Sequence, residues 1–262
     1  MHGRVAQVRL IAPSIVAVAL LFAGAGYAQQ SQVEPTPQLS TTRLTVDGSA
    51  LAFGRYLASL QERNPFTESG PTDVQIDASL PGLAKQGSMQ LVRQTGPSER
   101  SEYRLIKFEG DLTVKHQVIA RYLAAQERAE DSPYSSVAIT PANYKFRYMG
   151  SLATDGTAVY IFQIAPRKKR VGLICGQIWI DSASGIAVRQ VGRFVRRPSI
   201  FIRRIEVTRD TNLRNGLPYN RVTHLAIDTK LVGRAELTVT ECPLQTPDRD
   251  AAQRLVTQGG AR

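Results

Sequence analysis

The sequence predicts an α+β, β-rich fold in which an open, curled antiparallel sheet forms a half-barrel and two amphipathic helices cover its concave face. Short segments with alternating apolar and polar residues follow one another with turn signals between them, which is typical of an antiparallel meander. Two helical segments are too short and too amphipathic to stand alone, so each must place its apolar face on a sheet. Long antiparallel sheets tend to curl, which favours the half-barrel.

Residues 1–28 are typical of a cleaved secretory signal peptide. Residues 1–9 carry two arginines and no acid, residues 10–26 are apolar, and Gly26-Tyr27-Ala28 offers the small side chains that a signal peptidase reads. A membrane anchor is the alternative, but Pro13 interrupts the apolar run and small residues end it. We therefore expect cleavage after Ala28 and a periplasmic location.

The rest of the chain is basic. Cleavage would remove Arg4 and Arg9 and no acidic residue, which lowers the formal charge from +11 to +9. In an exported protein this charge favours an anionic envelope surface over nucleic acid as a partner, and a merely solvated basic surface is the alternative. We expect a disordered tether over residues 29–44, one domain over residues 45–245 and a polar tail over residues 246–262.

Two stretches of the domain have helical periodicity. In the first, apolar residues recur at helical spacing ahead of Asn64-Pro65, which predicts the helix end; they are Phe53, Tyr56, Leu57 and Leu60. In the second, Asp111 is the predicted N-cap, Ser132-Pro133 is the predicted end, and one apolar stripe contains Val114, Val118, Tyr122 and Ala125. Between the helices the alternation predicts strands over residues 73–83, 87–93 and 101–109.

The remaining segments predict a meander of strands. In Tyr144-Lys145-Phe146-Arg147-Tyr148, aromatic and basic side chains alternate, which indicates a strand with one buried face. Further strands are expected over residues 158–164, 171–181, 186–195, 201–209, 219–229 and 233–241. Because the strands over 158–164 and 171–181 are apolar on both faces, we expect them in the middle of the sheet, covered on both sides.

The two cysteines leave a disulfide open. Two cysteines in an oxidising compartment usually pair. Cys175 and Cys242 belong to strands that three other strands would separate in an open sheet, which exceeds the reach of about 7 Å between Cα atoms. Sheet closure or a returning tail would be needed to bring them together.

Several segments of the second half resemble a known family. They are a Tyr-x-Phe-x-Tyr-x-Gly strand at 144–150, a strand ending in proline before a basic turn at 161–170, the run Gly176-Gln177-Ile178-Trp179-Ile180-Asp181, and Asn215-Gly216-Leu217-Pro218. The chain thereby resembles bacterial outer-membrane lipoprotein-sorting-like proteins of the LolA/LolB-like lipoprotein-carrier superfamily, which includes related envelope-stress sensors. The resemblance covers about residues 140–242, and the N-terminal half matches only in the order of its elements. It implies an open antiparallel barrel with a helical lid that binds acyl chains in its concave face.

The predicted ligand site is an apolar cavity between the helices and the sheet. Its predicted lining consists of Phe53, Tyr56, Val118, Tyr122, Tyr144, Phe146, Tyr148, Tyr160, Phe162, Ile178 and Trp179. For each of these, a place in a packed core is the alternative.

A second predicted site is basic. The hairpin tip Arg167-Lys168-Lys169-Arg170 is predicted to contact an anionic surface such as lipid headgroups, and a solvated tip is the alternative. On the following strands, Arg189, Arg193 and Arg197 share strand parity and can form one basic stripe.

The sequence carries no motif for catalysis, metal binding or phosphate binding. After residue 28 the histidines are His116 and His224, and their spacing is not that of a metal site. A serine triad that uses His224 with Asp228 or Asp181 is a minority alternative. We therefore expect no catalytic residue, no metal and no cofactor.

The predicted function is that of a non-enzymatic periplasmic carrier for a lipid or a lipidated protein, with peripheral contact to an anionic membrane and no nucleic-acid partner. The alternative is an envelope regulatory or scaffold protein that binds a protein partner on the same sheet.

Overall fold

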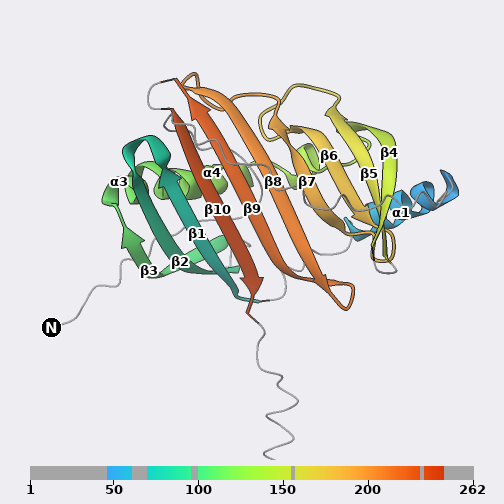
Figure 1. Ribbon diagram of the computed structural model, residues 1–262, viewed down its shortest axis with the longest axis horizontal. Coiled ribbons are helices and arrows are strands. Elements are labelled where there is room, and N and C mark those ends of the chain that lie inside the picture. The colour runs from blue at the N-terminus through green and yellow to red at the C-terminus, as the bar shows by residue number, and fades with distance from the viewer. Residues whose placement is uncertain (1–45, 61–69, 96–99, 155–156, 231–232, 245–262) are drawn as a thin grey trace, which may run out of the picture.

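The computed structural model describes residues 46–60, 70–95, 100–154, 157–230 and 233–244. Its ten strands form one antiparallel sheet in the order β3-β2-β1-β10-β9-β8-β7-β6-β5-β4, and the helices lie behind the sheet in Figure 1. The sheet is open, because β3 and β4 are its two edges. The predicted fold class is therefore confirmed. The predicted signal peptide, tether, tail and first-helix end at Asn64-Pro65 lie outside the described residues.

The first half of the domain supplies one helix and three strands. They are α1 (Val46–Ser59), β1 (Thr72–Leu80), the short 3-10 helix η1 (Pro81–Leu83), β2 (Lys85–Thr95) and β3 (Ser101–Gly110). Along β1, fully buried residues alternate with more exposed ones, as the period of two requires. The predicted strands of this half are therefore present.

A second helical region follows β3. It consists of α3 (Leu112–Val114), the π-helical turn η2 (Lys115–Ile119), α4 (Ala120–Glu130) and the short α5 (Tyr134–Val137). Asp111 is the N-cap as predicted, because its carboxylate accepts a hydrogen bond of 2.6 Å from the Thr113 amide. The wider turn at η2 brings Ile119 and Leu123 onto the buried face beside the predicted stripe.

The second half is the meander. Its strands are β4 (Tyr144–Thr154), β5 (Thr157–Pro166), β6 (Ile174–Asp181), β7 (Ala187–Phe194), β8 (Ile202–Arg214), β9 (Leu217–Thr229) and β10 (Arg234–Pro243). The expected central place of β5 and β6 is wrong, because both lie close to the β4 edge. The reason is that β10 pairs with β1, which puts β9, β10 and β1 nearer the centre of the sheet.

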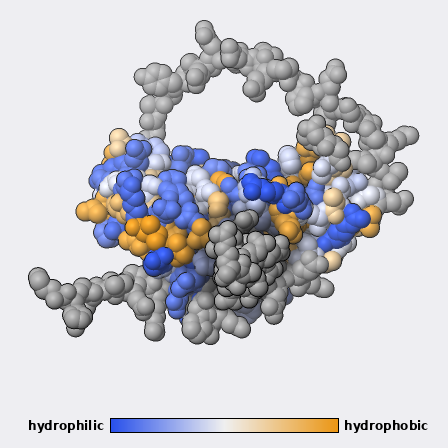
Figure 2. Space-filling view, turned by 90° about the horizontal axis from the view of Figure 1, so that it is seen from below, coloured by the Kyte–Doolittle hydropathy of each residue, from blue (hydrophilic) through white to orange (hydrophobic). Residues whose placement is uncertain are grey.

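Two hydrophobic cores lie side by side on the helix-covered face. The α4 core joins α3, η2 and α4 to β1, β2, β8, β9 and β10, and the α1 core joins α1 to β4, β5 and β6. Phe194 and Leu225 pack against both cores. Seen from below in Figure 2, apolar residues are also visible on the surface, on the left and on the right of the view.

Cys175 in β6 and Cys242 in β10 are free thiols, with β7, β8 and β9 between their strands. No helix within the described residues is long and apolar enough to cross a membrane.

Candidate ligand-binding site

Aromatic side chains of α1, β4 and β5 meet where α1 packs on the sheet. Because alternate residues of a strand share one face, β4 and β5 direct their aromatic residues to the same side. We call the group the aromatic cluster; it consists of Phe53, Tyr56, Tyr144, Phe146, Tyr148, Tyr160 and Phe162. The strand alternation that predicted these residues therefore also brings them together.

The rings of the aromatic cluster touch one another edge to face or tilted. Phe53 of α1 lies over the strands, with its ring centroid 4.7 Å from that of Phe146 and 5.4 Å from that of Phe162. Tyr148 lies 6.1 Å from Tyr160 and 5.7 Å from Phe162, again between ring centroids. These separations are the preferred ones for aromatic pairs. The cluster is thus a packed layer, and Tyr148, which is 37% exposed, forms its open rim.

Two tyrosine hydroxyls satisfy backbone groups within this apolar layer. The Tyr56 hydroxyl donates to the Ile139 carbonyl over 2.9 Å, and the Tyr144 hydroxyl accepts from the Ile174 amide over 3.1 Å. Burial raises the pKa of both tyrosines, so both remain protonated at neutral pH. Tyr56 therefore joins α1 to the loop before β4, Tyr144 joins β4 to the start of β6, and neither carries a charge.

Helix α1 rests on the sheet at a few close points. Gly48 is one, because any side chain there would collide with the Tyr160 hydroxyl. At a second point, the Arg55 guanidinium donates to the Ser182 carbonyl over 2.5 Å. Gly185 lies against Arg55 there, with a positive φ of 72° and no room for a Cβ atom. On its outer side α1 presents Leu51, which is 58% exposed. The helix therefore covers the aromatic cluster with its apolar face and leaves Leu51 in solvent.

The remaining predicted lining residues lie in three different places. Ile178 is fully buried in the α1 core. Val118 and Tyr122 belong to the α4 core instead. Trp179 points to the outer face of the sheet, opposite its neighbour Ile178, and packs against the guanidinium of Arg189 at 5.6 Å from the ring centroid. Adjacent strand residues face opposite ways, so Ile178 and Trp179 cannot line one cavity.

The sequence did not reveal a buried ionic cluster at the α4 side. Arg93 of β2 forms an ion pair with Glu241 of β10, and Arg221 of β9 lies 3.7 Å from the same carboxylate. Burial alone would raise the pKa of Glu241, but Arg93, Arg221 and Arg209 outweigh it and hold that pKa below its usual value. Burial lowers the pKa of Arg221 to about 10. The cluster is therefore charged at neutral pH.

Aromatic and acidic groups surround this ionic cluster. Burial raises the pKa of Tyr103 to about 12, and it also raises that of Tyr122. Glu130, at the end of α4, has two buried carboxylate oxygens that accept no hydrogen bond from the described residues. Burial raises the pKa of Glu130 to about 8, even though Arg100 and Arg93 lie near it. Glu130 is thus a neutral acid over most of the physiological range.

The basic hairpin tip is exposed, and two of its four residues are fixed. Arg167 donates from Nε to the Pro141 carbonyl over 2.8 Å, and Arg170 donates to the Asn143 side chain over 3.0 Å. Both acceptors are uncharged, so the tip keeps its positive charge. Lys168 and Lys169 are exposed between them.

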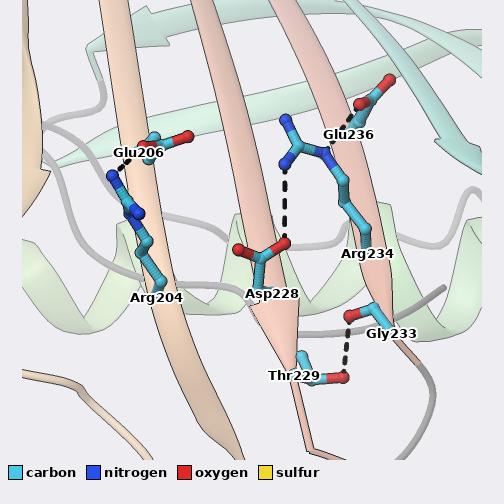
Figure 3. A network of polar contacts seen from close by, with 7 residues as sticks. All are labelled: Arg204, Glu206, Asp228, Thr229, Gly233, Arg234 and Glu236. Atoms are coloured by element: carbon cyan, nitrogen blue, oxygen red, sulfur yellow. Dashed lines mark hydrogen bonds and ion pairs between the residues drawn. The ribbon is translucent and has the colours of Figure 1, made fainter. Parts of the chain in front are cut away.

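The outer face of the sheet is polar and carries alternating charges. Arg234 binds both Asp228 and Glu236, and Arg204 binds Glu206, on the face turned away from the helices (Figure 3). Arg189 of the predicted basic stripe is itself paired with Asp210 over 3.1 Å.

A hollow of about 510 Å3 opens on this outer face, over β1, β2, β3 and β10. It is lined by Asp77, Glu109 and Glu236 with serine, threonine, glutamine and glycine residues. It is therefore not the predicted apolar cavity, which was expected on the helix-covered face of the sheet.

The residues considered for a serine triad, His224, Asp228 and Asp181, bind other partners. His224 is hydrogen-bonded to Thr238 over 3.0 Å, whereas Asp228 binds Arg234, and Asp181 accepts hydrogen bonds of 2.7 Å from Ser184. The triad considered from the sequence is therefore not assembled. Among the residues that the structure describes, no three His, Cys, Asp or Glu side chains are placed to hold a metal ion.

No family model matches the sequence, and no curated protein matches it. Among solved structures, the chain is similar to a LolA superfamily protein from Nitrosomonas europaea, with 14% identity and a TM-score of 0.34 over 77% of this chain and 96% of that chain. It is also similar to a DUF1329 family protein from Desulfovibrio piger, with 9% identity and a TM-score of 0.36 over 77% of this chain and 92% of that chain. A third similar structure is MucB, with 11% identity and a TM-score of 0.23 over 77% of this chain and 94% of that chain. One neighbour thus comes from the superfamily that the sequence motifs resemble. Because the identities and TM-scores are this low, no functional residue of these proteins is assigned to this chain.

Proposed function

We propose that the protein is a non-enzymatic periplasmic carrier that binds acyl chains of a lipid or a lipidated protein between α1 and the aromatic cluster. The observation that supports this most is the aromatic cluster itself, which a single short helix covers. Aromatic and aliphatic surface offers an acyl chain the same burial that α1 now provides. Binding therefore requires α1 to move away from β4 and β5.

The contacts of α1 suit such a movement. Its side-chain hydrogen bonds include three to distant backbone carbonyls, those of Ile139, Ser182 and Gly185. No ion pair of the described residues fastens α1 to the sheet. Each such hydrogen bond contributes about 0.5–1.5 kcal/mol net, which an entering acyl chain can offset at about 0.8 kcal/mol per buried CH2 group.

One observation favours the alternative of an envelope regulatory or scaffold protein. The aromatic rings are in contact with one another, and the hollow over β1, β2, β3 and β10 lies on the outer, polar face. A scaffold would use the same sheet to hold a protein partner and would need no movement of α1.

Extraction of the purified full-length protein with organic solvent, followed by mass spectrometry of the extract, distinguishes the two functions. We expect co-purified acyl chains in the wild type. Phe53→Ser should reduce them, because Phe53 packs on Phe146 and Phe162, whereas Leu51→Ser on the exposed side of the same helix should not. A wild type without acyl chains would favour the scaffold, and equal lipid content in both variants would place the ligand elsewhere.

A further inference from the structure

Three loops of the meander meet at one end of the sheet, at the top of Figure 1. They are the β5–β6 loop (167–173), the β7–β8 loop (195–201) and the start of the β9–β10 connection at Lys230. The Val195 amide donates to the Leu173 carbonyl over 3.0 Å, and the Lys230 amide donates to the Phe201 carbonyl over 2.9 Å. The three loops are therefore fixed relative to one another, and we call them the basic edge.

The basic edge exposes large apolar side chains. Ile200 is 74% exposed, Phe201 is 48% exposed and Val171 is 39% exposed. Ile200 and Phe201 lie in a turn that Ser199 stabilises. The Ser199 hydroxyl accepts a hydrogen bond from the Phe201 amide over 3.3 Å, and the Ser199 carbonyl accepts one from the Ile202 amide over 3.2 Å. An adjacent isoleucine and phenylalanine on an ordered loop are a costly arrangement in water unless another surface covers them.

Basic side chains surround these apolar residues. No acidic residue occurs from Ile164 to Ile180 or from Val195 to Ile205. The exposed basic residues of the edge and of the adjoining start of β8 are Arg167, Lys168, Lys169, Arg170, Arg196, Arg197, Lys230 and Arg203. Within the described part of the chain none of these eight is ion-paired, whereas Arg204, Arg189 and Arg234 on the outer face are.

We propose that the basic edge docks on the surface of an anionic lipid bilayer, with Ile200 and Phe201 inserted between the headgroups and the surrounding basic residues against the lipid phosphates. Apolar side chains ringed by arginine and lysine match the layered chemistry of such a surface, which is anionic outside and apolar beneath. The polar outer face, with its alternating charges, offers no such match. This docking does not depend on α1 or on the proposed acyl-chain site.

Sedimentation of the full-length protein with vesicles tests this inference. The probes are vesicles of equal parts phosphatidylglycerol and phosphatidylcholine, and vesicles of phosphatidylcholine alone. We expect binding to the anionic vesicles that falls steeply between about 0.1 M and about 0.5 M salt, as the Debye length shortens. Equal binding to the neutral vesicles would overturn the electrostatic part of the proposal.

Matched variants locate the contact. Replacing Lys168, Lys169, Arg196 and Arg197 with serine should weaken anionic-vesicle binding about tenfold or more, because basic residues near the surface supply most of the attraction. The control removes the same charge from exposed positions outside the edge, with serine at Arg104, Arg121, Arg128 and Arg214. Equal losses from the two quadruple variants would mean that net charge alone drives adsorption.

The apolar contact has its own control and a direct readout. Ile200→Ser with Phe201→Ser should weaken binding more than Leu105→Ser with Ile106→Ser, which alters another exposed apolar pair, on β3. In a Trp179→Phe background, Phe201→Trp should show a blue shift of its tryptophan emission with anionic vesicles, and Leu105→Trp should not. No shift at position 201 would refute insertion, even if a serine variant failed to fold. Acyl-chain extraction should be unchanged in every variant of the edge.

Discussion

The α4 core and the α1 core lie on the same face of one sheet but are held together differently. Beneath α4 the side chains are mostly aliphatic, and a buried ionic cluster of Arg93, Arg221 and Glu241 ties three strands together at one end. Beneath α1 the aromatic cluster packs among aliphatic side chains, and α1 donates side-chain hydrogen bonds to backbone carbonyls. The proposed opening for a ligand therefore concerns the α1 core, whereas the ionic cluster holds the strands of the α4 core together.

The largest expected effect comes from Glu241→Gln. This change removes the negative charge that compensates Arg93 and Arg221, and an uncompensated buried charge costs about 3–5 kcal/mol. We expect the free energy of unfolding in urea to fall by that amount. Glu236→Gln is the control, because its exposed ion pair with Arg234 contributes at most about 1 kcal/mol. Similar losses from both would show that the ionic cluster has no special structural role.

Tyr56→Phe tests the α1 core with a smaller change. It removes the hydroxyl that donates to the Ile139 carbonyl and should lower the free energy of unfolding by about 1–3 kcal/mol. Because it loosens α1, it should also speed the uptake of a fluorescent fatty acid, which Glu241→Gln should not do. Tyr219→Phe, at an exposed ring, is the control for both measurements. Slower uptake in Tyr56→Phe would contradict a lid role for α1.

The smallest expected effect concerns Glu130, because the residue as a whole is only half-buried although its carboxylate oxygens are covered. Its pKa is about 8 in the folded protein, against an ordinary value of 4.5. Between these pH values the folded protein holds a proton that the unfolded chain has released, so the free energy of unfolding falls as the pH rises.

Glu130→Gln should flatten this decline between pH 4.5 and pH 8 and leave the acid limb, where Glu241 takes up its proton, unchanged. Urea unfolding at a series of pH values measures both limbs. An unchanged slope in Glu130→Gln would mean that Glu130 is ionised in the folded protein.

Local periodicity predicted nearly all of the fold. The strands alternate with a period of two and the α4 stripe follows helical spacing, so the residues themselves record which face is buried. The place of β5 and β6 was not predictable in this way, because strand order depends on the pairing of β10 with β1. Trp179 was misplaced for a related reason. Its strand is apolar on both faces, and only the cross-strand partner Arg189 shows which face is outer.

The site was predicted less completely than the fold. The aromatic cluster followed from alternation in β4 and β5, but the ionic cluster did not. Arg93 and Glu241 lie 148 positions apart, and each resembles an ordinary surface charge in its local sequence. The sequence did hold one sign of it, because Arg93 of β2 and Glu241 of β10 occupy positions where the alternation calls for a buried apolar residue. The hydrogen bonds of Arg167 and Arg170 to uncharged acceptors likewise depend on a distant loop.

The pairing of β1 with β10 also sets the order in which the chain can fold. Every other ladder of the sheet joins strands that are neighbours in sequence and can form as local hairpins. The β1–β10 ladder instead joins Thr72 to Pro243 and must close a long loop before it gains any contact. Closing such distant pairs is slow. The β1–β3 hairpins and the β4–β10 meander therefore remain separate units until the last strand is available, and only then can the α4 core and its ionic cluster form.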